Sequence, residues 1–292
     1  MTDTAIDSII EVRPSGAALG AEIAGVDLSR PLSDADFRTI EQAFNTHSVI
    51  CLRDQHIGED RFLAYCRRFG EVEINFLTHY GHPDYPEIMQ VSNIQENGKN
   101  IGHADAGRVW HSDMSYMDTP PRATILHACE VPMDEERGII GDTLFSSAVA
   151  AYDDLPQATK ERLEGLVAVH RVSERRKKIG TGAQDNKYRD AMPDVFHPVA
   201  RTHPFTGRKS IYVSEGECVG ILDMPDEEAA PLLADLTKRV IEKRYRYRHK
   251  WQKGDVLMWD NCAVQHVAIH DYEWPKHRRM MHRVTVGGST TY

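Results

Sequence analysis

The stretch Val109-Trp110-His111-Ser112-Asp113-Met114-Ser115-Tyr116 places a histidine and an aspartate two positions apart. If this stretch is an extended strand, the two-residue period of a strand puts His111 and Asp113 on one face. An imidazole and a carboxylate on one face can bind the same metal ion. The stretch therefore predicts half of a metal site, which a second histidine from far along the chain would complete.

Two further His-x-Asp pairs, at 82–84 and 103–105, show that the spacing alone does not identify the site. His82 precedes a proline in a run rich in Gly, Pro and Asp, which is typical of a turn. His103 lies in a loop rich in Gly, Asn and Asp. Only His111 follows an aromatic and a branched residue, so we expect it to be the ligand.

Composition and charge exclude several classes of protein. The 292 residues carry a net charge of -9, which argues against a general nucleic-acid binder. No apolar run is long enough for a membrane span, and the acidic start does not resemble a signal peptide, so we expect a cytoplasmic protein without membrane contact. The cysteines are odd in number and never in Cys-x-x-Cys spacing, which predicts buried thiols rather than disulfides or a zinc knuckle. They are Cys51, Cys66, Cys129, Cys218 and Cys262.

A basic run at 170–178 is the local exception to the acidic charge. It fits either a phosphate-binding patch or a solvated loop, and the Gly180-Thr181-Gly182 that follows favours the loop.

Hydrophobic periodicity predicts a single domain over residues 1–292, with a loop and helical insertion at about 146–196. Strands on both sides of this insertion, with helices packed outside, favour a mainly β fold with flanking helices, a double-stranded β-helix or jelly roll. We expect helices at 34–46, 59–69, 147–152, 159–166 and 225–243, and strands at 9–12, 21–26, 48–52, 87–91, 109–116, 123–131, 141–145, 198–204, 209–213, 245–251, 256–259 and 279–286.

The second histidine of the metal site is expected in the C-terminal strands. His266 is preferred because it follows Trp259-Asp260-Asn261 at the end of a hydrophobic strand, whereas its competitors lie in polar loops or alternate within other strands. Those competitors are His249, His270, His277 and His282.

Two histidines and one carboxylate suit ferrous iron in an oxygenase, because three metal positions stay open. A 2-oxoacid cosubstrate would chelate the iron, and its far carboxylate would need an arginine. Arg278, Arg279 and Arg283 are candidates, and the strand period puts Arg279 and Arg283 on the same face. The hydroxyl of Thr143 would add a second hydrogen bond.

Six motifs in this order resemble the taurine dioxygenase and 2,4-dichlorophenoxyacetate dioxygenase family of Fe(II)- and 2-oxoglutarate-dependent oxygenases. Together with 25–28 and 68–71 they extend the resemblance over residues 11–288. The motifs are Trp110-His111-Ser112-Asp113, Thr119-Pro120-Pro121, Gly141-Asp142-Thr143-Leu144, Arg201-Thr202-His203-Pro204, Trp259-Asp260-Asn261 with His266, and Arg278-Arg279-Met280-Met281-His282-Arg283.

The resemblance implies a reaction as well as a fold. Oxidative decarboxylation of 2-oxoglutarate to succinate and CO2, with O2 as oxidant, would be coupled to hydroxylation of a substrate C–H bond. The presence of Asp113 argues against a halogenase activity, because related halogenases lack a carboxylate at this position. The implied roles are iron binding by His111, Asp113 and His266, 2-oxoglutarate binding by Thr143 and Arg279, and binding of a substrate anion near Arg283.

Departures from the family pattern bear on the substrate. Taurine-specific members have a histidine where this chain has Asn75, and an apolar aromatic where it has Glu217, so taurine is not the expected substrate. We expect a carboxylate or sulfonate at Arg283, and Glu217 would receive an amine if it faces the pocket or would be a solvated loop residue if it does not. Asn93 is a further candidate for substrate contact.

Two other classes of protein stay open. A zinc-dependent hydrolase would use the same three ligands with one water, but it would not need Thr143 and Arg279. A non-catalytic jelly-roll ligand-binding protein would need neither the metal ligands nor the arginine. The expected partner is a small-molecule substrate, with no nucleic acid and no membrane, and the expected assembly is a homo-oligomer.

Overall fold

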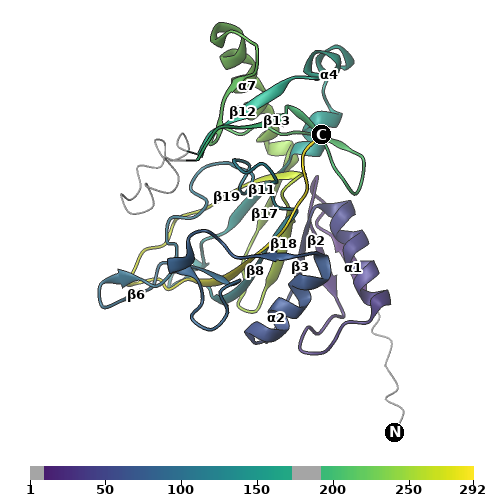
Figure 1. The fold of residues 1–292 in the computed structure, drawn as a ribbon. Helices are drawn as coiled ribbons and strands as arrows, with labels where there is room; N and C mark the ends of the chain where they lie inside the picture. Colours follow the sequence, from purple (N-terminus) through teal and green to yellow (C-terminus); the bar gives the residue numbers. More distant parts are fainter. Residues whose placement is uncertain (1–9, 173–191) are drawn as a thin grey trace.

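The computed structural model describes residues 10–172 and 192–292 (Figure 1). The basic run at 170–178 lies outside the described residues from position 173 onward, and so does the first residue of the strand expected at 9–12. Within the described ranges, no helix has both the length and the apolar character needed to cross a membrane.

A large, mostly antiparallel sheet forms the centre of the molecule. Its strands are β1 (Glu11–Pro14), β2 (Ala21–Ala24), β3 (Val49–Leu52), β18 (Val256–Asp260), β8 (Ala123–Glu130), β20 (Met280–Val286), β4 (Val72–Glu73) and β5 (Met89–Ser92). The order is β1-β2-β3-β18-β8-β20-β4, and β5 also pairs with β20. The contact between β2 and β3 is parallel. Strands from both ends of the chain therefore lie side by side in this sheet.

A second sheet of three antiparallel strands packs against one face of the large sheet. It consists of β17 (Arg246–His249), β11 (Thr143–Ser147) and β19 (Val264–Ala268), in the order β17-β11-β19. One buried cluster combines Leu126, Leu257 and Met281 from the large sheet with Phe145 and Val264 from the small one. We call the face of the large sheet that contributes to this cluster its inner face. The mainly β prediction is confirmed, whereas the double-stranded β-helix stays a prediction.

Helices α1 (Asp34–His47) and α2 (Glu59–Cys66) cover the opposite, outer face of the large sheet (Figure 1). The hydroxyl of Ser33 caps α1 by accepting a hydrogen bond from the backbone N–H of Asp36, as the expected capping motif predicts. Both helices lie where the sequence places them. Phe44 and Phe62 are wholly buried in the cluster between helices and sheet.

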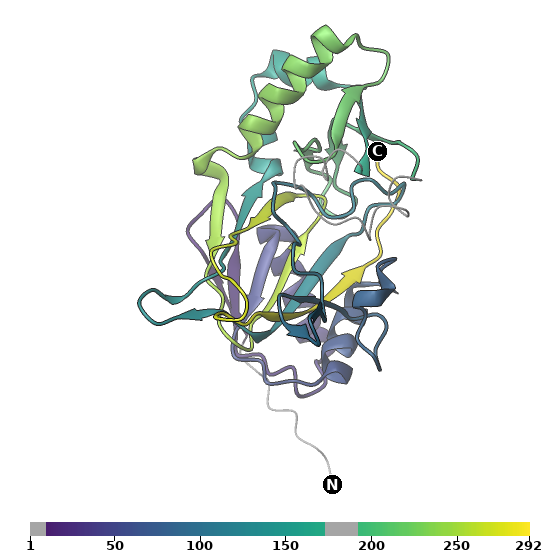
Figure 2. The same ribbon diagram turned by 90° about the vertical axis from the view of Figure 1, so that its left-hand side faces the viewer.

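The chain between β11 and β17 forms a lobe with its own buried cluster, at the top of both ribbon views (Figures 1 and 2). This cluster runs from Ala148 to Tyr245, so the lobe extends beyond the insertion expected at 146–196. The lobe contains α3 (Ala148–Asp153), α4 (Gln157–Leu163), β12 (Val167–His170), β13 (Val195–Pro198), β14 (Ala200–Thr202), β15 (Lys209–Ile211), β16 (Cys218–Ile221), α7 (Asp226–Val240) and the short η4 (Lys243–Tyr245).

Small elements complete the surface around the sheets. They are η1 (Arg67–Phe69), η2 (Thr78–Tyr80) and the strand pairs β6 (Gln95–Glu96) with β7 (Lys99–Asn100) and β9 (Met133–Asp134) with β10 (Gly138–Ile139).

The strand expected at 109–116 is wrong. His111 makes a single antiparallel bridge with His266, and the residues from 113 to 116 form turns. Met114 takes a left-handed conformation with φ of 51°, which a continuing strand does not allow. The two-residue period therefore does not explain how His111 and Asp113 meet.

Gly288 allows the C-terminal segment to cross the chain just before β8. A Cβ at this position would lie 1.9 Å from the carbonyl oxygen of Pro120. We expect Gly288→Ala to lower the free energy of unfolding by about 1–3 kcal/mol, because backbone on both sides must shift. Gly220→Ala is the control, because its Cβ position has no atom of the described residues within 4 Å apart from those of Gly220 and its two chain neighbours. Urea unfolding midpoints that fall equally in both variants would contradict the prediction.

Candidate metal centre

Three side chains from distant parts of the chain converge at the edge of the small sheet. One ligating atom from each of His111, Asp113 and His266 lies within 4.8 Å of the others, and all three residues are buried. The two histidines exchange both backbone hydrogen bonds, with N···O distances of 3.2 and 2.9 Å. Their rings lie 4.2 Å apart between centroids. The β-bridge thus brings the imidazoles of His111 and His266 together. The turn after His111 places the carboxylate of Asp113 beside them.

The tautomer of His111 is set by a backbone carbonyl. Its Nδ1 lies 2.7 Å from the carbonyl oxygen of Val109. Because a carbonyl only accepts hydrogen bonds, Nδ1 carries the proton and Nε2 presents a lone pair. That Nε2 lies 3.4 Å from Oδ1 of Asp113. An imidazole oriented in this way has the form in which histidine binds metals.

Asp113 is held ionised and in a fixed orientation. The hydroxyl of Thr124 donates to its Oδ2 over 2.7 Å, and the side-chain amide of Asn261 donates to that hydroxyl over 3.2 Å. A nitrogen of Arg283 lies 3.2 Å from the same Oδ2. Burial alone would raise the pKa of Asp113, but the positive charge of Arg283 and the neighbouring imidazoles hold it well below its usual range.

His266 is fixed on β19 by aromatic packing. Its ring stacks on Phe145 of β11 with 5.7 Å between centroids, and it contacts Trp259 at 4.7 Å. Phe145 is also its partner across the strand pair. The ring is therefore held from both sheets, with its Nε2 3.9 Å from Oδ2 of Asp113.

Arg279 lies just before β20, with only 5% of the residue exposed. Its guanidinium lies 5.8 Å from the ring centroid of Tyr272, and its Nε has no hydrogen-bond partner among the described residues. No described carboxylate forms an ion pair with it. Because a buried charge without a counter-charge is costly, this position favours an anionic ligand.

Asn93 holds the backbone of this segment. Its side-chain oxygen accepts from the N–H of Arg279 over 2.9 Å, and its side-chain N–H donates to the carbonyl of His277 over 2.8 Å. The hydroxyl of Ser92 donates to the carbonyl of Arg279 over 2.8 Å. These contacts position Arg279, so substrate contact by Asn93 stays a prediction.

Thr143 begins β11 and is buried. The indole N–H of Trp251, itself 1% exposed, donates to the Thr143 hydroxyl oxygen over 3.0 Å. Since the indole is only a donor, the hydroxyl keeps its own proton for an acceptor, as the expected contact with an oxoacid requires.

The remaining two predicted site residues make local contacts. The side chain of Asn75 accepts a hydrogen bond from the N–H of Leu77 over 2.9 Å, as in an Asx turn. Glu217 is wholly buried and accepts from the hydroxyl of Ser214 over 2.5 Å. The solvated-loop interpretation of Glu217 is therefore wrong, because the structure encloses this carboxylate, while an amine contact stays a prediction.

The competing histidines have other partners. His249 lies 3.0 Å from Asp255, His277 lies 3.2 Å from Asp134, and His270 contacts the carbonyl of Ala106 at 3.1 Å. His282 points to the outer face of the large sheet, where it contacts Glu59. Among these candidates, His266 alone joins His111 and Asp113.

Sequence reasoning missed three residues that support the centre. Thr124, Asn261 and Trp251 lie on other elements and touch it only in the folded chain. Asn261 belongs to the motif Trp259-Asp260-Asn261, but its contact with Thr124 was not predicted, and nothing local marks Thr124.

The donor set fits ferrous iron. Two imidazole nitrogens and one carboxylate oxygen on one side leave three positions for other ligands, which is the arrangement of non-haem iron oxygenases. A buried arginine without a described counter-charge and a hydroxyl with a proton to donate suit a dianionic cosubstrate.

Comparison with known proteins places the chain among oxygenases. The profile of the family described as taurine catabolism dioxygenase TauD, TfdA matches residues 11–285. The alpha-ketoglutarate-dependent 2,4-dichlorophenoxyacetate dioxygenase of Burkholderia sp. (strain RASC) is 32% identical over 277 residues, covering 91% of each chain. An alpha-ketoglutarate-dependent sulfate ester dioxygenase of Pseudomonas putida is 29% identical, covering 96% of this chain and 90% of the relative. A crystal structure of a taurine dioxygenase from Burkholderia xenovorans matches with a TM-score of 0.79 at 28% identity, covering 96% of this chain and 90% of that one.

Proposed function

Because the chain belongs to the taurine catabolism dioxygenase TauD, TfdA family and is thus an Fe(II)- and 2-oxoglutarate-dependent dioxygenase, we propose that it hydroxylates a small organic anion. The observation that carries the proposal is the buried group of two imidazoles and a carboxylate beside Arg283. Family membership favours this function over the metal-dependent hydrolase and the non-catalytic ligand-binding protein that the sequence left open.

The proposed iron ligands are His111, Asp113 and His266. The Val109 carbonyl keeps Nε2 of His111 unprotonated, and Thr124 orients the carboxylate of Asp113. The side chains therefore need little rearrangement to bind a metal, which favours tight binding.

We assign the cosubstrate to Thr143 and Arg279. The guanidinium would pair with the far carboxylate of 2-oxoglutarate in a bidentate contact, and the Thr143 hydroxyl would donate to the same group. Asn93 fixes the backbone at Arg279, and Trp251 fixes the side chain of Thr143, before the cosubstrate arrives. Bound iron, 2-oxoglutarate and O2 supply the oxidising power for C–H hydroxylation, with succinate and CO2 as products.

Arg283 is the proposed contact for the substrate anion. It lies within β20, four residues after Arg279, which directly precedes this strand, and four residues of extended chain span about 13 Å. Its Nε is buried and has no hydrogen-bond partner among the described residues. The relatives named above act, by their names, on a carboxylate and a sulfate ester, which supports an acidic group on the substrate.

The proposal also covers the fold, the domain organisation, further substrate contacts, the location and the assembly of the protein. The cluster between the large and small sheets supports a double-stranded β-helix within one domain over residues 1–292. A substrate amine at Glu217, contacts from Asn75, a cytoplasmic location and a homo-oligomeric assembly stay predictions.

Anaerobic spectroscopy tests the proposal directly. Ferrous iron and 2-oxoglutarate are added to metal-free protein, and the weak visible charge-transfer band of an iron-bound 2-oxoacid is recorded. We expect the band only when both are present. Small carboxylates, sulfonates and sulfate esters are then ranked by how they perturb the band and by how much succinate they release in air. A wild-type protein without the band would contradict the proposed centre.

Arg283→Gln tests the anion contact. We expect the KM of the best anionic substrate to rise about 10- to 150-fold, because a charged hydrogen bond contributes about 1.5–3 kcal/mol. The iron and 2-oxoglutarate band should form as in the wild type. A variant that loses the band as well would show that Arg283 acts through its contact with Asp113 instead.

A further inference from the structure

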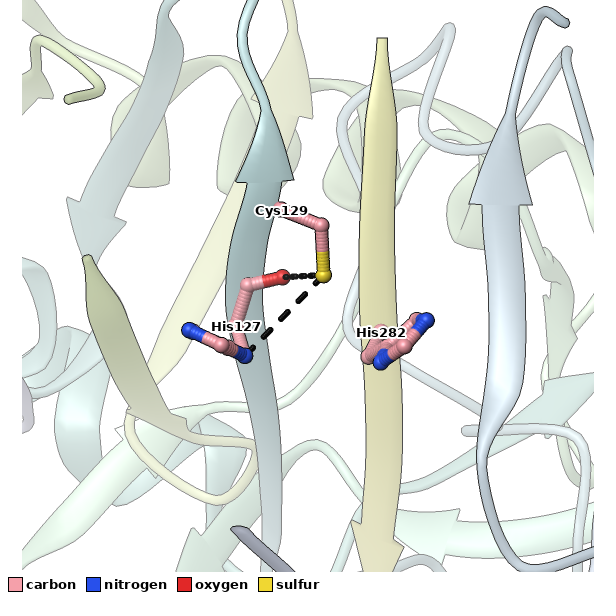
Figure 3. A group of neighbouring side chains, drawn as sticks. All are labelled: His127, Cys129 and His282. Atoms are coloured by element: carbon pink, nitrogen blue, oxygen red, sulfur yellow. Dashed lines mark hydrogen bonds between the residues drawn. The ribbon is translucent and has the colours of Figure 1, made fainter. Parts of the chain in front are cut away.

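Three ligating side chains meet on the outer face of the large sheet, on the side away from the proposed iron centre. His127 and Cys129 project from β8 and His282 projects from the neighbouring β20 (Figure 3). One ligating atom from each lies within 4.8 Å of the others. In the same two strands, Thr124 and Arg283 face the inner side and contact Asp113. Strand alternation therefore separates this group from the iron centre by the thickness of the sheet.

The pairing of β8 with β20 brings the three residues together. His127 and His282 are direct cross-strand partners, whose Cβ atoms lie about 5 Å apart in such pairs. The register then shifts, because Met281 pairs with Ala128 and Met280 pairs with Glu130. Cys129 is the extra residue of this bulge. Bulges re-aim side chains, and here the thiol points toward His127, where it contacts the carbonyl oxygen and Nδ1, with His282 on the neighbouring strand (Figure 3).

One ring nitrogen of each histidine lies near an acceptor oxygen, as is common for histidines that bind metals through the other nitrogen. Nε2 of His127 lies 3.0 Å from the carbonyl oxygen of Gln55, so it carries the proton and Nδ1 presents a lone pair. That Nδ1 lies 4.0 Å from the sulfur of Cys129. Nδ1 of His282 lies 3.7 Å from a carboxylate oxygen of Glu59. Carbonyl and carboxylate acceptors of this kind orient metal-bound imidazoles.

We propose that His127, Cys129 and His282 form a second metal site that takes a thiolate-binding ion of the Zn²⁺ type. Two imidazoles and one thiolate suit Zn²⁺ and leave a fourth position open. Ligand atoms around tetrahedral zinc lie about 3.3–3.6 Å apart, from bond lengths of about 2.0–2.3 Å. The observed sulfur-to-nitrogen distance of 4.0 Å closes to this value with a small side-chain rotation.

The surroundings support a site rather than chance proximity. Glu59, His82 and His282 make a second group of possible ligands that shares His282, and the rings of His82 and His282 lie 5.5 Å apart. Cys129 is half-buried. A bound ion would join β8, which carries Thr124, to β20, which carries Arg283.

Co²⁺ titration of the metal-free, full-length protein tests the proposal. Co²⁺ will also occupy the iron centre, but that centre has no sulfur ligand. A near-ultraviolet sulfur-to-cobalt charge-transfer band therefore reports only on a cysteine-containing site. We expect this band to saturate with one equivalent of Co²⁺ per protein chain in addition to the equivalent that fills the iron centre. The band should disappear when Zn²⁺ is added and displaces Co²⁺.

Three variants identify the ligands. Cys129→Ser and His282→Asn should each abolish the band, and Glu59→Gln should weaken Co²⁺ binding about 10- to 100-fold. Cys218→Ser is the matched control, because its sulfur also lies beside a histidine, 3.5 Å from His170, and it should keep the band. Circular dichroism verifies that each variant is folded.

The outcome is independent of the proposed dioxygenase function. Cys129→Ser should still form the visible iron and 2-oxoglutarate band. A wild-type protein without a sulfur-to-cobalt band, or a band that survives in Cys129→Ser, would overturn the second site while leaving the iron centre untouched.

Discussion

Replacing His111 with alanine is expected to lower the affinity for ferrous iron by more than about 100-fold, because losing even a residue that only orients a ligand costs about 10–100-fold. Its Nε2 faces Asp113 at 3.4 Å, and among the described residues no other histidine joins Asp113 and His266. The variant should show no visible iron and 2-oxoglutarate band and no succinate formation with any substrate.

Two further variants serve as comparisons for His111→Ala. His56→Ala removes an exposed histidine paired with Asp54 and should behave as the wild type. Thr124→Val removes the hydroxyl that donates to Asp113 and should weaken iron binding by about 10–100-fold, an intermediate effect. Full iron affinity in His111→Ala, measured by equilibrium dialysis, would rule out the proposed ligand set.

The second large effect is expected at Arg279. Arg279→Ala should weaken 2-oxoglutarate binding by about 2–5 kcal/mol, roughly 30- to several thousand-fold, because it removes one partner of a buried charge pair. Iron binding should change little. Anaerobic titration of 2-oxoglutarate into the iron-loaded protein, followed by the visible band, measures the loss.

Arg278 offers a matched control at the adjacent position. Its guanidinium is half-exposed and pairs with Glu130 over 2.8 Å, so Arg278→Ala should bind 2-oxoglutarate as the wild type does. Arg279→Lys keeps the charge but not the bidentate geometry, and should fall between wild type and alanine. Equal losses in the Arg278 and Arg279 variants would point to a general effect of charge rather than a specific contact.

Much of the architecture could be predicted from local patterns. The helices expected at 34–46 and 59–69 carry an apolar stripe, and the structure confirms both, although the second is α-helical only over Glu59–Cys66 and ends in a 3-10 helix at Arg67–Phe69. The strands that flank the centre are continuous buried runs, such as β18 with all five residues buried. Such signals depend on a few neighbouring residues, so no long-range information is needed.

The geometry of the proposed metal centre could not be predicted from neighbouring residues alone. The sequence placed His111 and Asp113 together for the wrong reason, since a bridge and a turn rather than a strand bring them close. Thr124 and Trp251 act through contacts with residues far along the chain. Glu217 could not be told from a surface residue because its burial depends on how the lobe packs.

The bridge between His111 and His266 also affects when a metal centre can exist during synthesis. The two histidines lie more than half the chain apart in sequence, and they meet only when β19 docks beside β11. Pairing between strands so far apart in sequence is slow, because the entropy of closing a long loop opposes it. A nascent chain still attached to the ribosome, with His266 inside the exit tunnel, holds His111 and Asp113 but cannot complete the set. Iron can therefore be bound by the full ligand set only after His266 has left the tunnel and β19 has docked beside β11.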